Sequence, residues 1–174
     1  MTWANAVTLA RLGLTPVLIL AFLWGPAWLF FALFALIMVG DLLDGALARW
    51  QGHITDLGKA LDPLVDKVLF TSLFIALAIK AFVTWELVIL IAIPQLALLV
   101  GGVVLFQRWK LVIEARWSGK LATLVLALGL LALLVEAKLQ IEIPWAYEIT
   151  YAGVSLSYAA GFDYLLNALR LVRR

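Results

Sequence analysis

The sequence predicts an all-α, polytopic membrane protein with six transmembrane helices. Of its 174 residues, 66% are hydrophobic and only 14% are charged, whereas a soluble domain has about 45–50% apolar and about 25% charged residues. The mean hydropathy is +1.08, and apolar runs near the length of about 20 residues that crosses a bilayer recur along the chain. We therefore expect one transmembrane domain over residues 1–174, with spans at about 5–24, 27–49, 60–82, 85–107, 119–136 and 145–170.

The first span ends at Gly25-Pro26, a pair typical of turns. Near its start, Asn5, Thr8 and Arg11 recur every three residues and share one stripe of the helix. One interpretation is structural, with a helix cap, a tolerated Thr and an Arg that extends its charge to the membrane surface. The other is functional, with the stripe facing a polar site, and the spacing alone leaves both open.

The second span contains the uninterrupted apolar run AWLFFALFALIMVG and ends in an acidic segment. A polar connector at 50–58 follows, in which His53 is expected to be a loop residue and Asp56 a loop or cap residue. The third span should begin between Lys59 and Pro63, because proline loses no helical hydrogen bond in the first turn.

The fourth span contains Pro94, which predicts a kink, and Gly101-Gly102, which permit close helix contact. A basic connector at 108–118 precedes the fifth span. The sixth span follows a short loop that contains Pro144.

Positive charge is concentrated at alternate ends of the predicted spans, which favours six spans with both termini in the cytoplasm. A net charge of +2 argues against nucleic acid as a partner. The N-terminus lacks the basic region and cleavage site of a signal peptide, so it is expected to be a retained helix. The cationic residues on the predicted cytoplasmic side are Arg49, Lys59, Arg108, Lys110, Arg116, Lys120, Arg170, Arg173 and Arg174.

Two pairs of carboxylates lie at the ends of apolar runs, Asp41 with Asp44 and Asp62 with Asp66. On a helix the members of the first pair are about 60° apart around the axis and those of the second about 40°, so each pair points one way. Two facing helices would then gather four carboxylates into one oxygen-rich cavity, the ligand set that Mg²⁺ or Mn²⁺ requires. With no Cys and one His in the chain, a zinc or soft-ligand site is not expected.

Small residues and one arginine accompany the acidic residues. Gly45, Ala46 and Ala48 leave the backbone bare where a bulky ligand can approach. Arg49 offers a planar donor suited to phosphate oxygens. Metal, bare backbone and arginine together indicate a pyrophosphate.

This stretch resembles the signature of the CDP-alcohol phosphatidyltransferase family at eight fixed positions over 26 residues, without a substitution. The resemblance implies a membrane enzyme in which an alcohol hydroxyl attacks a CDP-linked lipid and displaces CMP. It also implies a homodimer and two divalent cations. The matching positions read Asp41-x2-Asp44-Gly45-x2-Ala48-Arg49-x8-Gly58-x3-Asp62-x3-Asp66.

The resemblance also implies a role for each matching residue. Asp41, Asp44 and Asp62 would be metal ligands, and Asp66 would be both a ligand and the catalytic base. The residues of the CDP pocket would be Gly45, Ala48 and Arg49, with Gly58 allowing close approach. The opening Asn5-x2-Thr8-x2-Arg11 resembles the start of the bacterial glycerophosphate and cardiolipin synthases of this family. This resemblance implies that Asn5 and Thr8 bind the CDP-lipid.

The acceptor alcohol is indicated less directly. The run from Gly58 to Lys67, GxxLDPxxDK, resembles phosphatidylglycerophosphate synthases and cardiolipin synthases, so the acceptor is glycerol 3-phosphate or, alternatively, phosphatidylglycerol. Glycerophosphate synthases carry an Arg inside the fourth span, where this chain has only Gln95 as a polar side chain. The residues expected to bind the acceptor are Arg108, Lys110, Arg116 and Lys120.

Two interpretations from other classes compete with the enzyme. A transporter of metal ions or protons also has carboxylates within the membrane, but these should lie near the midplane and on several helices. A non-catalytic scaffold gives no reason for Gly45, Arg49 and Gly58 at their spacing. The enzyme hypothesis places the protein in a bacterial cytoplasmic membrane among CDP-diacylglycerol and other lipids, with its site facing the cytoplasm.

Overall fold

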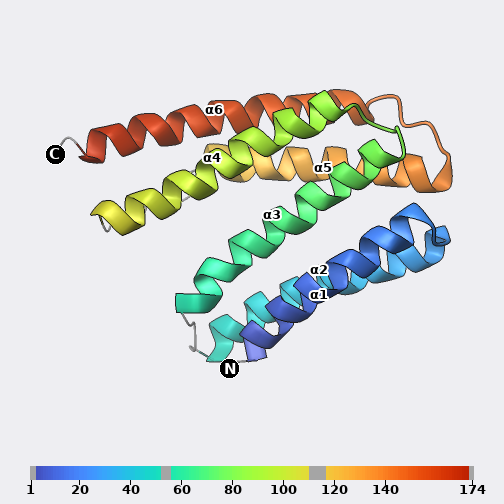
Figure 1. Ribbon diagram of the computed structural model, residues 1–174, viewed down its shortest axis with the longest axis horizontal. Coiled ribbons are helices and arrows are strands. Elements are labelled where there is room, and N and C mark those ends of the chain that lie inside the picture. Colours follow the sequence, from blue (N-terminus) through green and yellow to red (C-terminus); the bar gives the residue numbers. More distant parts are fainter. Residues whose placement is uncertain (1–2, 52–55, 110–116, 173–174) are drawn as a thin grey trace. The chain divides into compact units, whose positions relative to one another are not determined.

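The computed structural model describes the backbone of residues 3–51, 56–109 and 117–172, and the side chains of residues 10–40, 65–105, 107–108 and 117–171. The secondary structure of this part of the chain is α-helical (Figure 1). The all-α class is therefore confirmed. The helices are α1 (Trp3–Leu23), α2 (Ala27–Gln51), α3 (Asp56–Ile79), α4 (Trp85–Trp109), α5 (Trp117–Leu139) and α6 (Ala146–Val172).

The chain forms two compact units, Met1–Lys80 and Ala81–Arg174, and each is described by itself. In the first unit, α1 packs against both α2 and α3. The turn between α1 and α2 requires Gly25, because a Cβ there would lie 2.8 Å from the carbonyl oxygen of Ala21. The rings of Phe22 and Phe30 then meet edge to face across the hairpin, with centroids 5.2 Å apart.

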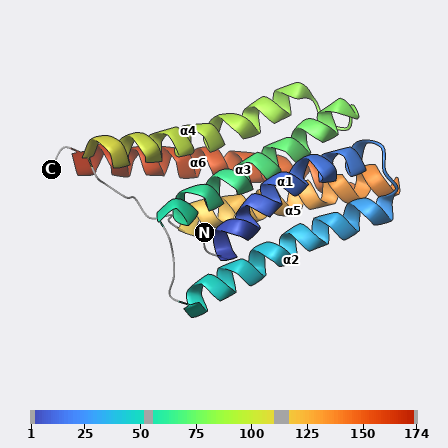
Figure 2. The same cartoon turned by 60° about the horizontal axis from the view of Figure 1, so that its bottom comes forward.

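The second unit is built around α6, which packs against α5 and α4 and runs beside α4 in both ribbon views (Figures 1 and 2). Glycine lets α5 and α6 approach closely where they cross. A Cβ on Gly129 of α5 would lie 2.8 Å from the Cα of Thr150, and one on Gly153 of α6 would lie 2.7 Å from the Cα of Leu126. The two backbones are therefore nearly in contact, as is typical of membrane helices that meet at small residues.

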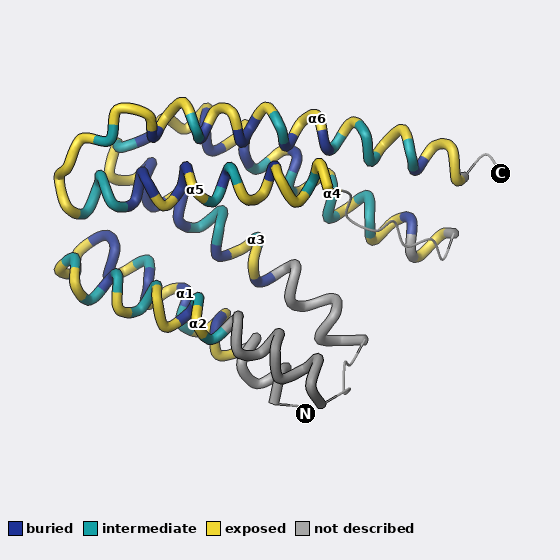
Figure 3. The backbone as a smooth tube through the Cα atoms, turned by 180° about the vertical axis from the view of Figure 1, so that it is seen from behind, coloured by how far each residue is buried: buried dark blue, intermediate teal, exposed yellow. Residues whose placement is uncertain are grey.

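Two of the described helices are long and apolar enough to cross a bilayer. Their apolar segments are Trp85–Leu105 in α4 and Trp117–Leu139 in α5, with mean hydropathies of 2.6 and 2.1. Shorter apolar segments are found at Ala10–Leu23 and Ala27–Gly40. In Figure 3, exposed positions follow the outer faces of α4, α5 and α6, and on α4 and α5 they include many Leu, Ile and Val side chains. Crossing of the membrane by all six helices remains a prediction.

The start of the third helix differs from the prediction. Helix α3 begins at Asp56, before the expected interval between Lys59 and Pro63. Asp56 is therefore the first residue of α3, at the helix start to which the cap alternative assigned it and not in the loop, and Pro63 lies beyond the first turn. The hydropathy of a sequence marks only the apolar part of a helix. The backbone hydrogen bonds of the helix continue into polar sequence, so the apolar run is shorter than the helix.

The loop after α3 contains a residue in the left-handed region, Ala81, whose φ is 56°. An L-residue with a Cβ pays about 1–2 kcal/mol for this conformation and glycine does not. We expect Ala81→Gly to raise the free energy of unfolding by about 1 kcal/mol. The measurement is thermal or denaturant unfolding of the purified protein. Ala159→Gly, at an exposed position inside α6, should lower the free energy of unfolding by a similar amount. A lower stability in both variants would contradict the prediction.

Candidate active site

The acidic motif lies on two consecutive helices. Asp41 and Asp44 belong to the C-terminal part of α2, and Asp62 and Asp66 to the N-terminal part of α3. Because both segments are helical, each pair has the helical spacing on which the metal-site hypothesis depends. Only the side chain of Asp66 falls within the described residues. The side chains of Asn5, Thr8, Asp41, Asp44, Gly45, Ala48, Arg49, Gly58 and Asp62 lie outside that part, and their roles stay predictions.

Asp66 forms an ion pair with Arg11 of α1. The Arg11 Nη2 atom donates to Asp66 Oδ1 over 2.6 Å. The two partners differ in environment, because the Arg11 side chain is 5% exposed and the Asp66 side chain is 54% exposed. A buried guanidinium therefore holds one oxygen of a carboxylate that solvent or a ligand can reach.

Arg11 lies on the buried side of α1 together with Thr15, Leu18 and Phe22. The Thr15 hydroxyl donates to the Arg11 carbonyl oxygen over 2.9 Å within the helix. The interpretation of Arg11 as a side chain that extends its charge to the membrane surface is therefore wrong. Its carboxylate partner is 55 residues away in the sequence, so the stripe of residues 5, 8 and 11 was the only signal that pointed to it.

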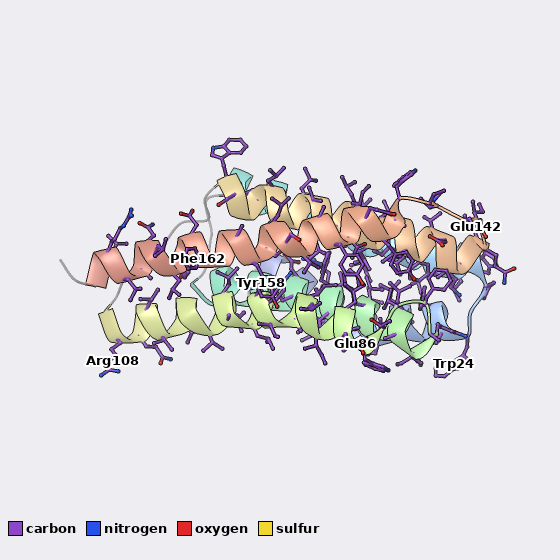
Figure 4. All side chains as sticks on the ribbon, turned by 90° about the horizontal axis from the view of Figure 1, so that it is seen from above. Trp24, Glu86, Arg108, Glu142, Tyr158 and Phe162 are labelled. Carbon is purple, nitrogen blue, oxygen red and sulfur yellow. The ribbon has the colours of Figure 1, made fainter. Side chains whose placement is uncertain are left out.

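Two of the four residues expected to bind the acceptor are described, and both belong to the second unit. Arg108 is exposed at the C-terminal end of α4 and projects away from it (Figure 4). Lys120 is exposed near the start of α5, with its Nζ atom 5.6 Å from the centre of the Trp117 ring, a cation–π distance. Both are exposed cations, whereas Lys110 and Arg116 lie outside the described residues.

The second unit also contains an apolar groove of about 510 Å³ between α4 and α6. Gly101 and Gly161 leave room for it, and Tyr158 and Phe162 of α6 contribute to its lining (Figure 4). The predicted close contact at Gly101-Gly102 is present in a loose form, because a Cβ on either residue would lie 3.9 or 3.6 Å from Tyr164. The lining of the groove, as far as the described residues form it, contains no charged side chain, so it is suited to apolar groups.

The donor set of the motif fits hard divalent cations. Its four acidic side chains are all carboxylates, and Mg²⁺ and Mn²⁺ prefer such oxygen donors. Asp66, which Arg11 holds on one oxygen, shows that the start of α3 presents an accessible carboxylate. The residues that would hold the metal are therefore Asp41, Asp44, Asp62 and Asp66.

Comparisons with known proteins agree with this chemistry. The sequence model of the CDP-alcohol phosphatidyltransferase family matches residues 1–159. A Mycobacterium tuberculosis protein named "Probable phosphatidylglycerophosphate synthase" is 35% identical over 96% of this chain and 81% of its own length. The Streptomyces coelicolor cardiolipin synthase (CMP-forming) is 30% identical over 99% of this chain and 85% of its own. The CDP-diacylglycerol–glycerol-3-phosphate 3-phosphatidyltransferase of Aquifex aeolicus is 36% identical over 76% of this chain and 75% of its own.

Proposed function

The chain belongs to the CDP-alcohol phosphatidyltransferase family, and we propose that it transfers the phosphatidyl group of CDP-diacylglycerol to glycerol 3-phosphate and releases CMP. The observation that carries the proposal is the similarity, over 96% of the chain, to a relative named as a phosphatidylglycerophosphate synthase. Family membership favours an enzyme over the transporter and the scaffold. The acidic motif supplies the groups that the reaction needs.

The proposed reaction has one proton acceptor in the protein. Asp66 takes the proton of an acceptor hydroxyl, and that oxygen attacks the phosphorus that carries diacylglycerol. A new P–O bond forms to the acceptor, and the P–O bond to the CMP phosphate breaks. The accessible carboxylate of Asp66 supports its role as the base, because a base must reach the hydroxyl that it deprotonates.

Binding of the nucleotide diphosphate is assigned to the remaining motif residues. Asp41, Asp44, Asp62 and Asp66 would hold two divalent cations, Mg²⁺ or Mn²⁺, which when bound neutralise charge on the pyrophosphate and on the leaving CMP. The other members of the proposed CDP-lipid site are Gly45, Ala48, Arg49, Gly58, Asn5 and Thr8. The proposed acceptor contacts are Arg108, Lys110, Arg116 and Lys120.

The two long apolar helices, together with a family that acts on lipids, indicate a membrane protein. We extend this to six transmembrane spans in one catalytic domain over residues 1–174, placed in a bacterial cytoplasmic membrane. The distribution of Lys and Arg supports a site that faces the cytoplasm. We also propose that the protein assembles as a homodimer.

Phosphatidylglycerol is the second candidate acceptor, which would make the product cardiolipin. Two observations favour it specifically. The cardiolipin synthase of Streptomyces coelicolor is similar to 99% of this chain, and Gln95 is the only polar side chain in the run IAIPQLALLVGG.

The test uses purified protein, labelled CDP-diacylglycerol and separate acceptors, with the product identified by mass. Glycerol 3-phosphate should yield phosphatidylglycerophosphate and an equal amount of CMP. Cardiolipin formed from phosphatidylglycerol alone would replace the first candidate by the second. No CMP release with glycerol 3-phosphate, phosphatidylglycerol or other alcohols would overturn the proposed function.

Removal of divalent metal should stop the reaction. We expect excess EDTA to lower the rate of CMP release below detection, because four clustered carboxylates would repel a pyrophosphate unless cations neutralise them. Added Mg²⁺ or Mn²⁺ should restore the rate, and added Ca²⁺ controls for a general effect of divalent ions on the membrane. Full activity in rigorously metal-free buffer would contradict the two-cation site.

A further inference from the structure

A positive charge lies inside the packed interface of the first unit. Arg11 is 4% exposed, on the same side of α1 as the fully buried Leu18. An isolated guanidinium is expensive in such surroundings, because burial removes its water without supplying hydrogen-bond acceptors. Asp66, at 2.6 Å, supplies a charged acceptor.

The pair is asymmetric, and the asymmetry shows which partner orders the other. Arg11 is buried on α1, which packs against α3, and Thr15 on α1 and Val65 on α3 are buried as well, at 4% and 1% exposed. Asp66 is 54% exposed, so packing confines its side chain less than it confines that of Arg11. The anchored guanidinium therefore restricts the orientation of the accessible carboxylate.

A structural role alone explains this arrangement poorly. Ion pairs with a partner in solvent contribute little to stability, typically about 0–1 kcal/mol, while the desolvation of Arg11 opposes folding. An apolar residue at position 11 would fill the α1–α3 contact without that penalty. What a buried arginine adds is a charged donor at a fixed position, because its Nη2 atom holds one oxygen of the Asp66 carboxylate over 2.6 Å.

We propose that Arg11 is the positioning residue of Asp66, and that it holds the carboxylate in the orientation from which one oxygen takes the acceptor proton. This inference rests on the proposed function, in which Asp66 is the base. Arg11 acts through Asp66 and contacts neither substrate. Such preorganisation raises kcat because the base needs no reorientation when the hydroxyl arrives.

The test compares Arg11→Gln and Arg11→Lys with the wild type, in the full chain and in lipid nanodiscs. A misplaced catalytic group reduces the rate by about 100-fold, so Arg11→Gln should lower kcat by about that factor. The KM for CDP-diacylglycerol should change by less than about threefold, since the loss affects the chemical step and not binding. Arg11→Lys keeps the charge without the planar fork, so its kcat should be about tenfold below the wild type.

Thr15→Val is the matched control. Thr15 lies one turn further along the same buried side of α1 and bonds only within its own helix among the contacts described for it. Val has the same shape and removes the hydroxyl, so a general disturbance of the α1–α3 contact would appear in this variant. We expect its kcat to stay within about twofold of the wild type, since a back-bonded helical Thr contributes little.

Four results would overturn the positioning role. The first is a wild-type kcat in Arg11→Gln. The second is a raised KM with unchanged kcat in that variant, which would make Arg11 a substrate-binding residue. The third is an equal loss of kcat in Thr15→Val, and the fourth, if Arg11→Gln does not fold, is a wild-type kcat in Arg11→Lys. Each of these requires an active wild type. A wild type that releases no CMP would instead overturn the proposed function, so the two failures are distinguishable.

Discussion

Replacing Asp66 by Asn is expected to lower the kcat for CMP release by about 10²- to 10⁴-fold, the range that a positioned general base contributes. The Asn side chain has nearly the same size, but its amide cannot take a proton from a hydroxyl. Its carbonyl oxygen can still accept the hydrogen bond of Arg11, so that arginine keeps a partner. The Tm should therefore stay within about 5 °C of the wild type. The measurement is the rate of CMP release at saturating CDP-diacylglycerol and acceptor.

Asp163→Asn is the control for this substitution, because it makes the same chemical change on α6 in the other unit. It should leave kcat unchanged. Asp66→Glu gives a second comparison, since it retains a base but moves the carboxylate by one methylene, and we expect an intermediate kcat. A near-normal rate in Asp66→Asn would rule out Asp66 as the base.

The positions of the helices followed from the sequence, but the start of α3 did not. Gly25 and Pro26 marked the first turn correctly because proline and glycine disfavour helix for local reasons. The start of α3 at Asp56 was missed because the apolar pattern reports where a helix meets hydrocarbon. A helix that continues into polar surroundings leaves no such mark.

The sequence predicted which residue types form the candidate site, but it did not predict the ion pair between Arg11 and Asp66. Spacing within one helix placed Asp62 and Asp66 on one side, since helical geometry is local. The ion pair of Asp66 with Arg11 joins positions 55 residues apart. No local pattern encodes such a pairing, because it depends on how α1 and α3 pack. The sequence could show only that Arg11 shared a stripe with two other polar residues.

Close helix contact was predicted at Gly101 and Gly102, where it is loose, and was not predicted at Gly129 and Gly153, where it is tight. Gly101 and Gly102 are adjacent and conspicuous, yet a Cβ there would make ordinary contacts of 3.9 and 3.6 Å with Tyr164. The tight positions are Gly129 and Gly153, where a Cβ would come within 2.8 Å of a facing backbone atom. Which glycine is needed depends on where two helices cross, and the crossing point is a property of tertiary packing.

Replacing Gly153 by Ala should strongly destabilise the second unit. The new Cβ would lie 2.7 Å from both the Cα and the backbone N of Leu126, and a backbone cannot yield as the end of a side chain can. Overpacking of this kind costs about 1–3 kcal/mol and occasionally more. Because water exclusion does not drive membrane helices together, lost packing between α5 and α6 has little to compensate it. We expect a lower Tm of the purified protein and a smaller folded fraction at 37 °C.

Gly161→Ala is the matched control on the same helix. Among the described residues, no atom outside its own helix backbone lies within 4 Å of the position that its Cβ would take, so the added methyl group meets no obstacle there. Alanine also favours helix over glycine by about 1 kcal/mol, which predicts a slightly higher Tm. The same preference acts at Gly153, where it opposes the clash, so the difference between the two variants isolates the contact with Leu126. Equal Tm values for Gly153→Ala and Gly161→Ala would show that α5 and α6 do not cross as closely as described.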